Sequence, residues 1–212
     1  MRTWSEDHPK ARLLERKQEA IRAAAKELFL RHGYANTTME MVAAQANVSI
    51  MTLYRHFRGK DILFQAVMQG FCNEHVKDTS EALWQGEPSE VLHRLGQMRL
   101  TFLLSPEETA LYRVVIGAME QFPDVGAMYY HLHFEKKPDR LAAYLQMLDQ
   151  QGTLSVPHPQ RSAQDFLTLL QGQIIERVRL GAIPTPTTEE IEQHIEACVA
   201  FFLAAHQIKH PD

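Results

Sequence analysis

The fold of this chain is decided by one stretch, Asn36–Phe64, which reads NTTMEMVAAQANVSIMTLYRHFRGKDILF. The stretch holds two very short segments with apolar residues at helical spacing, joined around Ala46, Asn47 and Val48. Isolated helices shorter than about 12 residues are marginal in water, so neighbouring helices must hold both segments in place. We expect the inward-facing residues to be Met41, Val42, Ala46, Val48 and Leu53.

The residues at the ends of the two segments predict where each helix begins and ends. Thr37-Thr38-Met39-Glu40 fits a capping box, in which Thr37 accepts from the backbone and Glu40 reaches back. This predicts a helix of about two turns that ends near Ala46. Asn47 tolerates a left-handed backbone nearly as well as glycine, and Ser49 caps a second helix through His56. Two helices joined by a three-residue turn in this way form a helix-turn-helix.

The second of these helices gathers hydrogen-bond donors on its outer side. We expect the exposed positions to be Ile50, Met51, Thr52, Arg55 and His56, with Tyr54 at the flank. Lys60, at the start of the next helix, adds a positive charge on the same side. Helix N-termini, hydroxyls and cations bind phosphates, and side chains on such a helix reach base edges, so the pattern favours DNA as the partner.

The run GYANTTMEMVAAQANVSIMTLYRHFRGKDILF resembles the N-terminal DNA-binding domain of the TetR/AcrR family of transcriptional regulators, over about residues 12–68. The resemblance implies phosphate contacts from Thr37, Tyr54, His56 and Lys60. It implies that base edges are read by residues among Ser49, Ile50, Met51, Thr52 and Arg55. The family often has glycine where Asn47 and Met51 stand here. Apolar bulk at Ile50 and Met51 leads us to expect contact with thymine methyl groups rather than hydrogen bonds to guanine.

Composition and charge agree with a DNA-binding protein of ordinary globular type. Of the 212 residues, 45% are hydrophobic and 23% charged, and the net charge is -4. Residues 1–60 hold eleven basic and six acidic residues, a balance of +5, and residues 61–212 hold eleven basic and twenty acidic residues, a balance of -9. No secretory signal or membrane-length apolar run is present, so we expect a soluble, cytoplasmic protein. Cys72 and Cys198 match no zinc or redox spacing and are expected to be reduced thiols.

The rest of the chain also has helical periodicity, so we predict an all-α fold. We expect a DNA-binding domain at 1–60 with a three-helix reading unit, and a ligand-binding and dimerisation domain at 61–212. The longer helices are expected at about 61–84, 89–104, 107–122, 125–150, 160–180 and 188–207. Pro138 is expected to kink or break the helix at 125–150.

A second resemblance concerns the segment LYRVVIGAMEQFPD, Leu111–Asp124, which is similar to the regulatory domain of AefR-like repressors. The helix is apolar nearly all round, which is typical of a helix in the middle of a domain. Its narrow polar stripe, which includes Arg113, Gly117 and Glu120, faces solvent, a buried ion pair or a ligand cavity. If it faces a cavity, Glu120 is the counter-charge for a cationic ligand. The candidate ligand-binding residues are Phe102, Tyr112, Ile116, Met119, Glu120, Tyr129, Tyr130 and Phe134.

Two late helices carry long apolar faces that resemble the four-helix dimer interface of the family. The candidate interface residues are Phe166, Leu170, Ile174, Ile195, Val199 and Phe202. An ordinary core is an equally good interpretation of any one of them. Dimerisation also has a mechanical reason, because one helix-turn-helix reads only half of a twofold site.

The leading hypothesis is therefore a dimeric repressor that a small apolar or amphipathic molecule releases from a palindromic DNA site; activation stays open. A helical enzyme or a ligand-binding module without DNA reading are the alternatives. No catalytic motif is visible, so we expect no enzyme activity and no cofactor. His131 and His133 point about 200° apart on a helix, so they do not form a metal site.

Overall fold

A computed structural model describes residues 9–76, 81–132 and 138–207 of the chain. Within these ranges the regular structure is helical and no strand is present, which confirms the predicted all-α class. By packing of the backbone the chain divides into two compact units. The first contains Met1–Cys72 and Ala110–Tyr129, and the second contains Asn73–Thr109 and Tyr130–Asp212. The predicted functional boundary between residues 60 and 61 stays a prediction.

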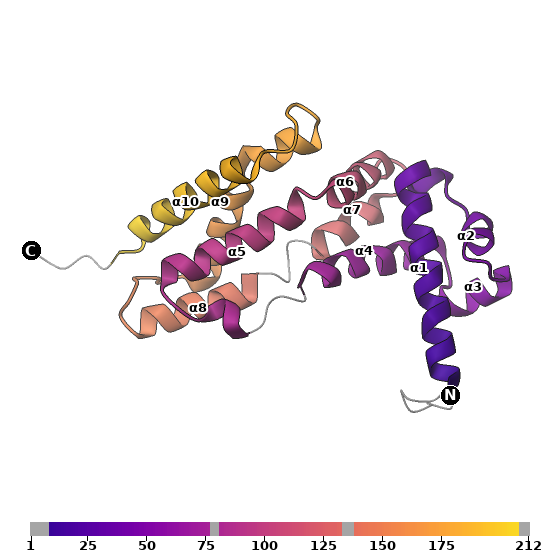
Figure 1. Ribbon diagram of the computed structural model, residues 1–212, viewed down its shortest axis with the longest axis horizontal. Helices are drawn as coiled ribbons and strands as arrows, with labels where there is room; N and C mark the ends of the chain where they lie inside the picture. Colours follow the sequence, from indigo (N-terminus) through magenta and orange to yellow (C-terminus); the bar gives the residue numbers. More distant parts are fainter. Residues whose placement is uncertain (1–8, 77–80, 133–137, 208–212) are drawn as a thin grey trace, which may run out of the picture. The chain divides into compact units, whose positions relative to one another are not determined.

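The first unit is built around one long helix. α1 spans Pro9–Asn36, α2 spans Met39–Gln45, α3 spans Ile50–His56 and α4 spans Lys60–Val76. α2 packs against α1 and α3 packs against α2, and the N-terminal turns of α1 project beyond α3 (Figure 1). α6, Pro106–Ala118, and α7, Pro123–Tyr130, supply the later part of this unit, although the first turn of α6 groups with the second unit.

An aromatic cluster forms the core of the first unit. Phe29 and Phe64 are fully buried, and their rings meet edge to face at 4.8 Å between centroids. Tyr34 packs against both rings and against Phe122, at 5.0–5.8 Å. Leu53, at 0% exposure, is the buried residue of α3. These contacts supply the neighbours that the two seven-residue helices need.

The ends of α2 and α3 agree with the predictions from the sequence in three places and differ from them in one. Ser49 caps α3, Asn47 has a φ of 52°, and α2 ends at Gln45, one residue before the predicted end. The predicted cap of α2 was wrong by one residue, because Thr38 accepts the hydrogen bond from the Met41 N–H. Thr37 is instead fully buried, with its hydroxyl 2.8 Å from the carbonyl oxygen of Gly33.

The second unit has a larger core of leucine and aromatic side chains. It contains the short 3-10 helix η1, Glu81–Trp84, and four helices: α5, Pro88–Leu103; α8, Pro138–Gln150; α9, Pro159–Arg179; and α10, Thr188–Ala205. α8 packs along α9, and α10 packs along α5. A Cβ on Gly96 would lie 2.8 Å from Ile195 Cγ2, so glycine is what permits α5 and α10 to approach this closely.

Two of the predicted long helices are shorter in the structure. The helix expected at 61–84 ends at Val76, and a separate 3-10 turn follows at η1. The helix expected at 125–150 is two helices, because α7 ends at Tyr130 and α8 begins at Pro138. Proline has no N–H to donate and is favoured in the first turn of a helix, so a new helix begins there.

Candidate nucleic-acid interface

α3 is held at both ends by hydrogen bonds. The Ser49 hydroxyl accepts from the Thr52 N–H at 3.1 Å and lies 2.8 Å from the Thr52 hydroxyl. The Phe57 N–H donates to the Leu53 carbonyl at the other end, and the Phe57 side chain is buried. With Leu53 and Phe57 anchored, the opposite side of α3 is turned outward.

The outward side of α3 carries most of the predicted DNA-binding residues. Met51 is 74% exposed, and Ile50 and Tyr54 are also exposed large side chains. Ser49 and Arg55 are exposed beside them. Thr52 is half-buried, and its hydroxyl contacts Ser49. Since positions 50, 51, 54 and 55 share one face of a helix, the structure gathers an apolar pair, a phenol and a guanidinium on a single surface.

His56 lies at the end of this surface in a half-buried position. Burial, then the positive charges of Arg55 and Lys17, lower the pKa of His56 below its usual value. The phosphate contact that the sequence predicts for His56 stays a prediction.

Two predicted phosphate contacts have other partners in the structure. Thr37 is fully buried within the first unit, so its predicted contact with a phosphate is wrong. Its hydroxyl lies within hydrogen-bond distance of the carbonyl oxygens of Leu28 and Gly33. The helical pattern of α1 is interrupted at Gly33, whose φ is 77°, and carbonyls near a helix end need such partners. The Lys60 ammonium donates to the carbonyls of Tyr34 at 2.9 Å and Ala35 at 3.2 Å, and burial lowers its pKa.

A groove of about 440 Å³ lies in the first unit between the end of α1 and one face of α6. Its α6 wall has helical spacing and includes Arg113 and Gly117, two members of the polar stripe noted in the sequence. A Cβ on Gly117 would meet nothing within 4 Å, so this residue opens onto free space. The full lining is Leu30, His32, Gly33, Tyr34, Ala35, Asn36, Ala110, Arg113, Val114, Gly117 and Ala118.

The predicted ligand-binding residues do not form one site. Of those that the structure describes, none lines the groove. Ile116, Met119, Glu120 and Tyr130 are exposed. Arg113, Ile116 and Gly117 are exposed positions of α6 itself, which contradicts a central, enclosed position for this helix. Tyr112 and Tyr129 pack together at 5.9 Å between ring centroids, and Phe102 belongs to the core of the second unit. Phe134 lies outside the described residues.

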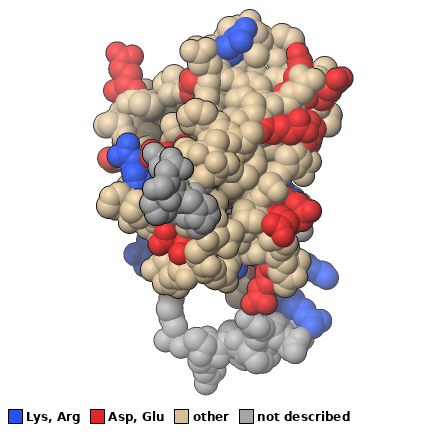
Figure 2. All heavy atoms as spheres, turned by 90° about the vertical axis from the view of Figure 1, so that its left-hand side faces the viewer, with Lys and Arg blue, Asp and Glu red and all other residues tan. Residues whose placement is uncertain are grey.

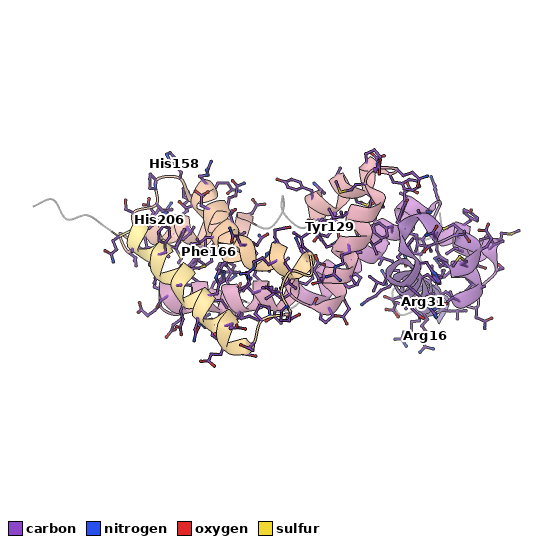
Figure 3. The ribbon with its side chains drawn as sticks, turned by 90° about the horizontal axis from the view of Figure 1, so that it is seen from above. Arg16, Arg31, Tyr129, His158, Phe166 and His206 are labelled. Carbon is purple, nitrogen blue, oxygen red and sulfur yellow. The ribbon has the colours of Figure 1, made fainter. Side chains whose placement is uncertain are left out.

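The predicted dimer residues are buried in the chain's own core instead. Five of them, Phe166, Leu170, Ile195, Val199 and Phe202, are at most 5% exposed, and Ile174 is partly buried against the same core. Phe166 lies among the helices of the second unit (Figure 3), 5.0 Å from Phe202 between ring centroids. These buried side chains are not free to contact a second copy.

The structure shows a different apolar surface on the same helices. Phe201 on α10 is 67% exposed, and Leu180, which follows α9, is 76% exposed. Exposed alanines at positions 197, 200 and 204 share the face of Phe201 at helical spacing. Sequence periodicity did not separate this face from the buried one, because both faces of α10 are apolar.

Other candidate chemistry is not supported by the described residues. Within the described part of the chain, no group of three or more metal-ligating side chains lies close enough to hold an ion. His131 is exposed, and His133 lies outside the described residues. Cys198 is buried, which raises the pKa of its thiol. In the same described part, no helix is long and apolar enough to cross a membrane.

Comparisons with known proteins agree on one family. Residues 21–67 match the model for bacterial regulatory proteins of the tetR family, and residues 90–208 match that for the C-terminal domain of AefR-like transcriptional repressors. The chain is 24% identical over 172 residues to the HTH-type transcriptional regulator YvkB of Bacillus subtilis strain 168, covering 74% of this chain and 81% of that one.

Solved structures give the same result over nearly the whole length. The flavonoid-responsive regulator FrrA is 30% identical with a TM-score of 0.78, over 92% of this chain and 100% of FrrA. A TetR-family transcriptional regulator from Mesorhizobium loti MAFF303099 is 25% identical with a TM-score of 0.81, over 92% of this chain and 98% of the other.

The position of Lys60 leads to a prediction about stability. Lys60→Met should lower the free energy of unfolding by about 1–2 kcal/mol in urea without DNA, because two carbonyls lose a charged donor. Arg58→Met, at an exposed basic neighbour, is the control and should change it little. If Lys60→Met leaves stability unchanged but lowers the salt dependence of DNA binding by one phosphate contact, the phosphate role expected from the sequence is the correct one.

Proposed function

This chain belongs to the TetR family of transcriptional regulators, and from that premise we propose that it is a repressor that binds a palindromic operator as a homodimer and is released by a small amphipathic molecule. In this proposal residues 1–60 bind DNA, residues 61–212 bind the second subunit, and the effector binds where the end of α1 meets α6. Because its target is chromosomal DNA, the protein acts in the cytoplasm.

The observation that carries the DNA-binding part is the outward face of α3. A helix of seven residues with exposed Ile50 and Met51 has no reason in its own packing to keep these side chains, which cost free energy in water. In the major groove they fit against thymine methyl groups, while Tyr54 and Arg55 reach phosphates and base edges. Ser49 and Thr52 contribute hydroxyls at the capped end.

Charge also favours the first unit as the part that binds DNA. Figure 2 shows the side of the molecule that lies on the left in Figure 1. Acidic side chains make up most of the charged surface in its foreground, around a broad uncharged area. A polyanion is repelled by such a face. The basic excess of residues 1–60 attracts it instead.

The first experiment is to recover and sequence genomic fragments that bind the purified protein. Fragments that share an inverted repeat, with half-sites about 34–36 Å apart or a multiple of that spacing, support a dimeric reader of bases. The same selection with Met51→Ala should change the base preference by about 1 kcal/mol at one position of each half-site. Ile62→Ala, an exposed apolar residue on α4, is the control. An unchanged preference in Met51→Ala would remove this residue from base reading.

We propose that the homodimer forms through the exposed apolar face of α10, defined by Ala197, Ala200, Phe201 and Ala204. Small residues let two helices approach closely, and Phe201 supplies a large side chain of the kind that dominates interfaces. We propose this exposed face as the dimer interface in place of the residues expected from the sequence, which are buried.

Phe201→Glu should weaken dimerisation at least about 30-fold, since it removes an anchor residue and places a charge in the contact. Sedimentation equilibrium measures the dimer dissociation constant. Met147→Glu, at an exposed apolar position on α8, is the matched control and should stay dimeric. Equal dissociation constants for the two variants would place the interface elsewhere.

The effector site is proposed to be the groove between α1 and α6. Its size suits a small organic molecule, and its lining mixes aliphatic residues with Tyr34, His32, Asn36 and Arg113. FrrA is named as flavonoid-responsive, so a flavonoid is the natural probe class. A flavonoid is flat, partly apolar and carries hydroxyls, which matches an amphipathic effector.

Naringenin should weaken operator binding of the wild-type protein, and Gly117→Trp should abolish this response while operator binding remains. The tryptophan would fill the space that opens at Gly117. Ile116→Trp, at the neighbouring exposed position, is the control and should respond as the wild type does. Fluorescence anisotropy of labelled operator measures both properties. A full response in Gly117→Trp would place the effector outside the groove.

A further inference from the structure

The N-terminal part of α1 continues well beyond the helices that it supports. The buried face of α1 begins at Ile21, and the residues before it that the structure describes are exposed or half-buried. At 1.5 Å per residue, the helix from Pro9 to Ile21 extends about 18 Å further. In Figure 1 these first turns of α1 project beyond α3.

This extension is basic on its exposed surface. Arg12, Arg16 and Lys17 are exposed within six residues, and Arg16 extends from α1 to the outside (Figure 3). Over residues 12–22 there are four basic and two acidic residues, a balance of +2. All three side chains are exposed, so they lie on the surface of the described part of the chain.

The extension lies close to the end of α3. Lys17 is near enough to His56 for its charge to act on the imidazole, alongside Arg55. Lys17 also lies one turn before the buried Ile21, on the same face of α1. A molecule that lies along the outward face of α3 therefore meets the α1 extension beyond His56.

We propose that the first turns of α1 form a second DNA-contact surface, in which Arg12, Arg16 and Lys17 bind phosphates outside the bases that α3 reads. This inference rests on the proposed function and enlarges its site. Arginine and lysine on a helix beside a reading helix neutralise backbone charge and carry no base preference. The extension therefore lengthens the footprint and strengthens binding without changing the sequence that is recognised.

The test compares two triple variants with the same change in net charge. Arg12→Ala/Arg16→Ala/Lys17→Ala removes the surface, and Arg31→Ala/Arg161→Ala/Arg177→Ala removes three exposed arginines elsewhere. Arg31 is on the same helix as Arg16, about 22 Å further along. Alanine retains the helix, so circular dichroism should show both variants folded.

Binding constants are measured as a function of salt on the selected operator and on an unrelated duplex. Each lost phosphate contact lowers the magnitude of the slope of log K against log salt by about 0.9, so the first triple variant should lose about 2–3 on both duplexes. The control triple variant should keep the wild-type slope. Hydroxyl-radical footprinting should show loss of the outermost protected positions on each side, with the central protection and base preference unchanged.

Equal slopes in the two triple variants, or an unchanged footprint, would overturn the inference. These outcomes are separate from failure of the proposed function. If the wild-type protein binds both duplexes equally, specific reading by α3 fails, and the slope on the unrelated duplex still decides the role of α1. If the wild-type protein binds neither duplex, both proposals fail.

Discussion

The contact on which the first unit depends is the packing of Phe64 against Phe29, with both rings fully excluded from water. α2 and α3 have seven residues each and no stability of their own, so their position is set by the larger helices around them. The Phe29–Phe64 contact fixes α4 to α1. Each such aromatic pair contributes about 0.5–1.5 kcal/mol beyond the area it buries. With this frame in place, burial of Leu53 and Phe57 turns the opposite side of α3 outward.

Tyr34 connects this frame to the proposed effector groove. Its ring packs on Phe29, Phe64 and Phe122, and the residue is also part of the groove wall. The Lys60 ammonium lies over the rings of Tyr34 and Phe122, at 4.6 and 5.5 Å from their centroids. A molecule in the groove therefore touches the same side chain that holds the end of α1 against α4. The route from the groove to the reading helix stays within one compact unit.

Local signals were predictable from the sequence, and the choice between helix faces was not. Ser49, Asn47 and the bounds of α3 follow from short-range chemistry, in which each residue satisfies or strains its own backbone. Thr37 and Thr38 are chemically alike, so only the open carbonyl of Gly33 distinguishes the buried hydroxyl from the capping one. The Gly33 carbonyl is open to the Thr37 hydroxyl because α1 is interrupted at Gly33, and the sequence pattern does not locate that interruption.

The choice between helix faces also explains why the predicted dimer residues and ligand-binding residues were wrong. α10 has two apolar faces, and the one that packs in the core is chosen by α5, where Gly96 admits Ile195. A single-sequence pattern contains no information about that partner. The groove was missed for a related reason, since one wall comes from the end of α1, about eighty residues before α6. The signal that could have revealed the groove is the helical spacing of the small residues Ala110, Gly117 and Ala118 on one face of α6.

The magnitudes indicate how few contacts have to change for the proposed release from DNA. The two hydrogen bonds from Lys60 contribute about 1 kcal/mol each, and the Tyr34–Phe122 contact about another 1 kcal/mol. Their sum, about 3 kcal/mol, is the size of a typical allosteric coupling. A coupling of about 2.7 kcal/mol weakens binding a hundredfold. An operator with about ten parts bound to one part free then has about one part bound to ten parts free. In the proposed mechanism, an effector that loosens only this set acts while Phe29, Phe64 and Leu53 stay packed, so the reading unit stays folded as it leaves the operator.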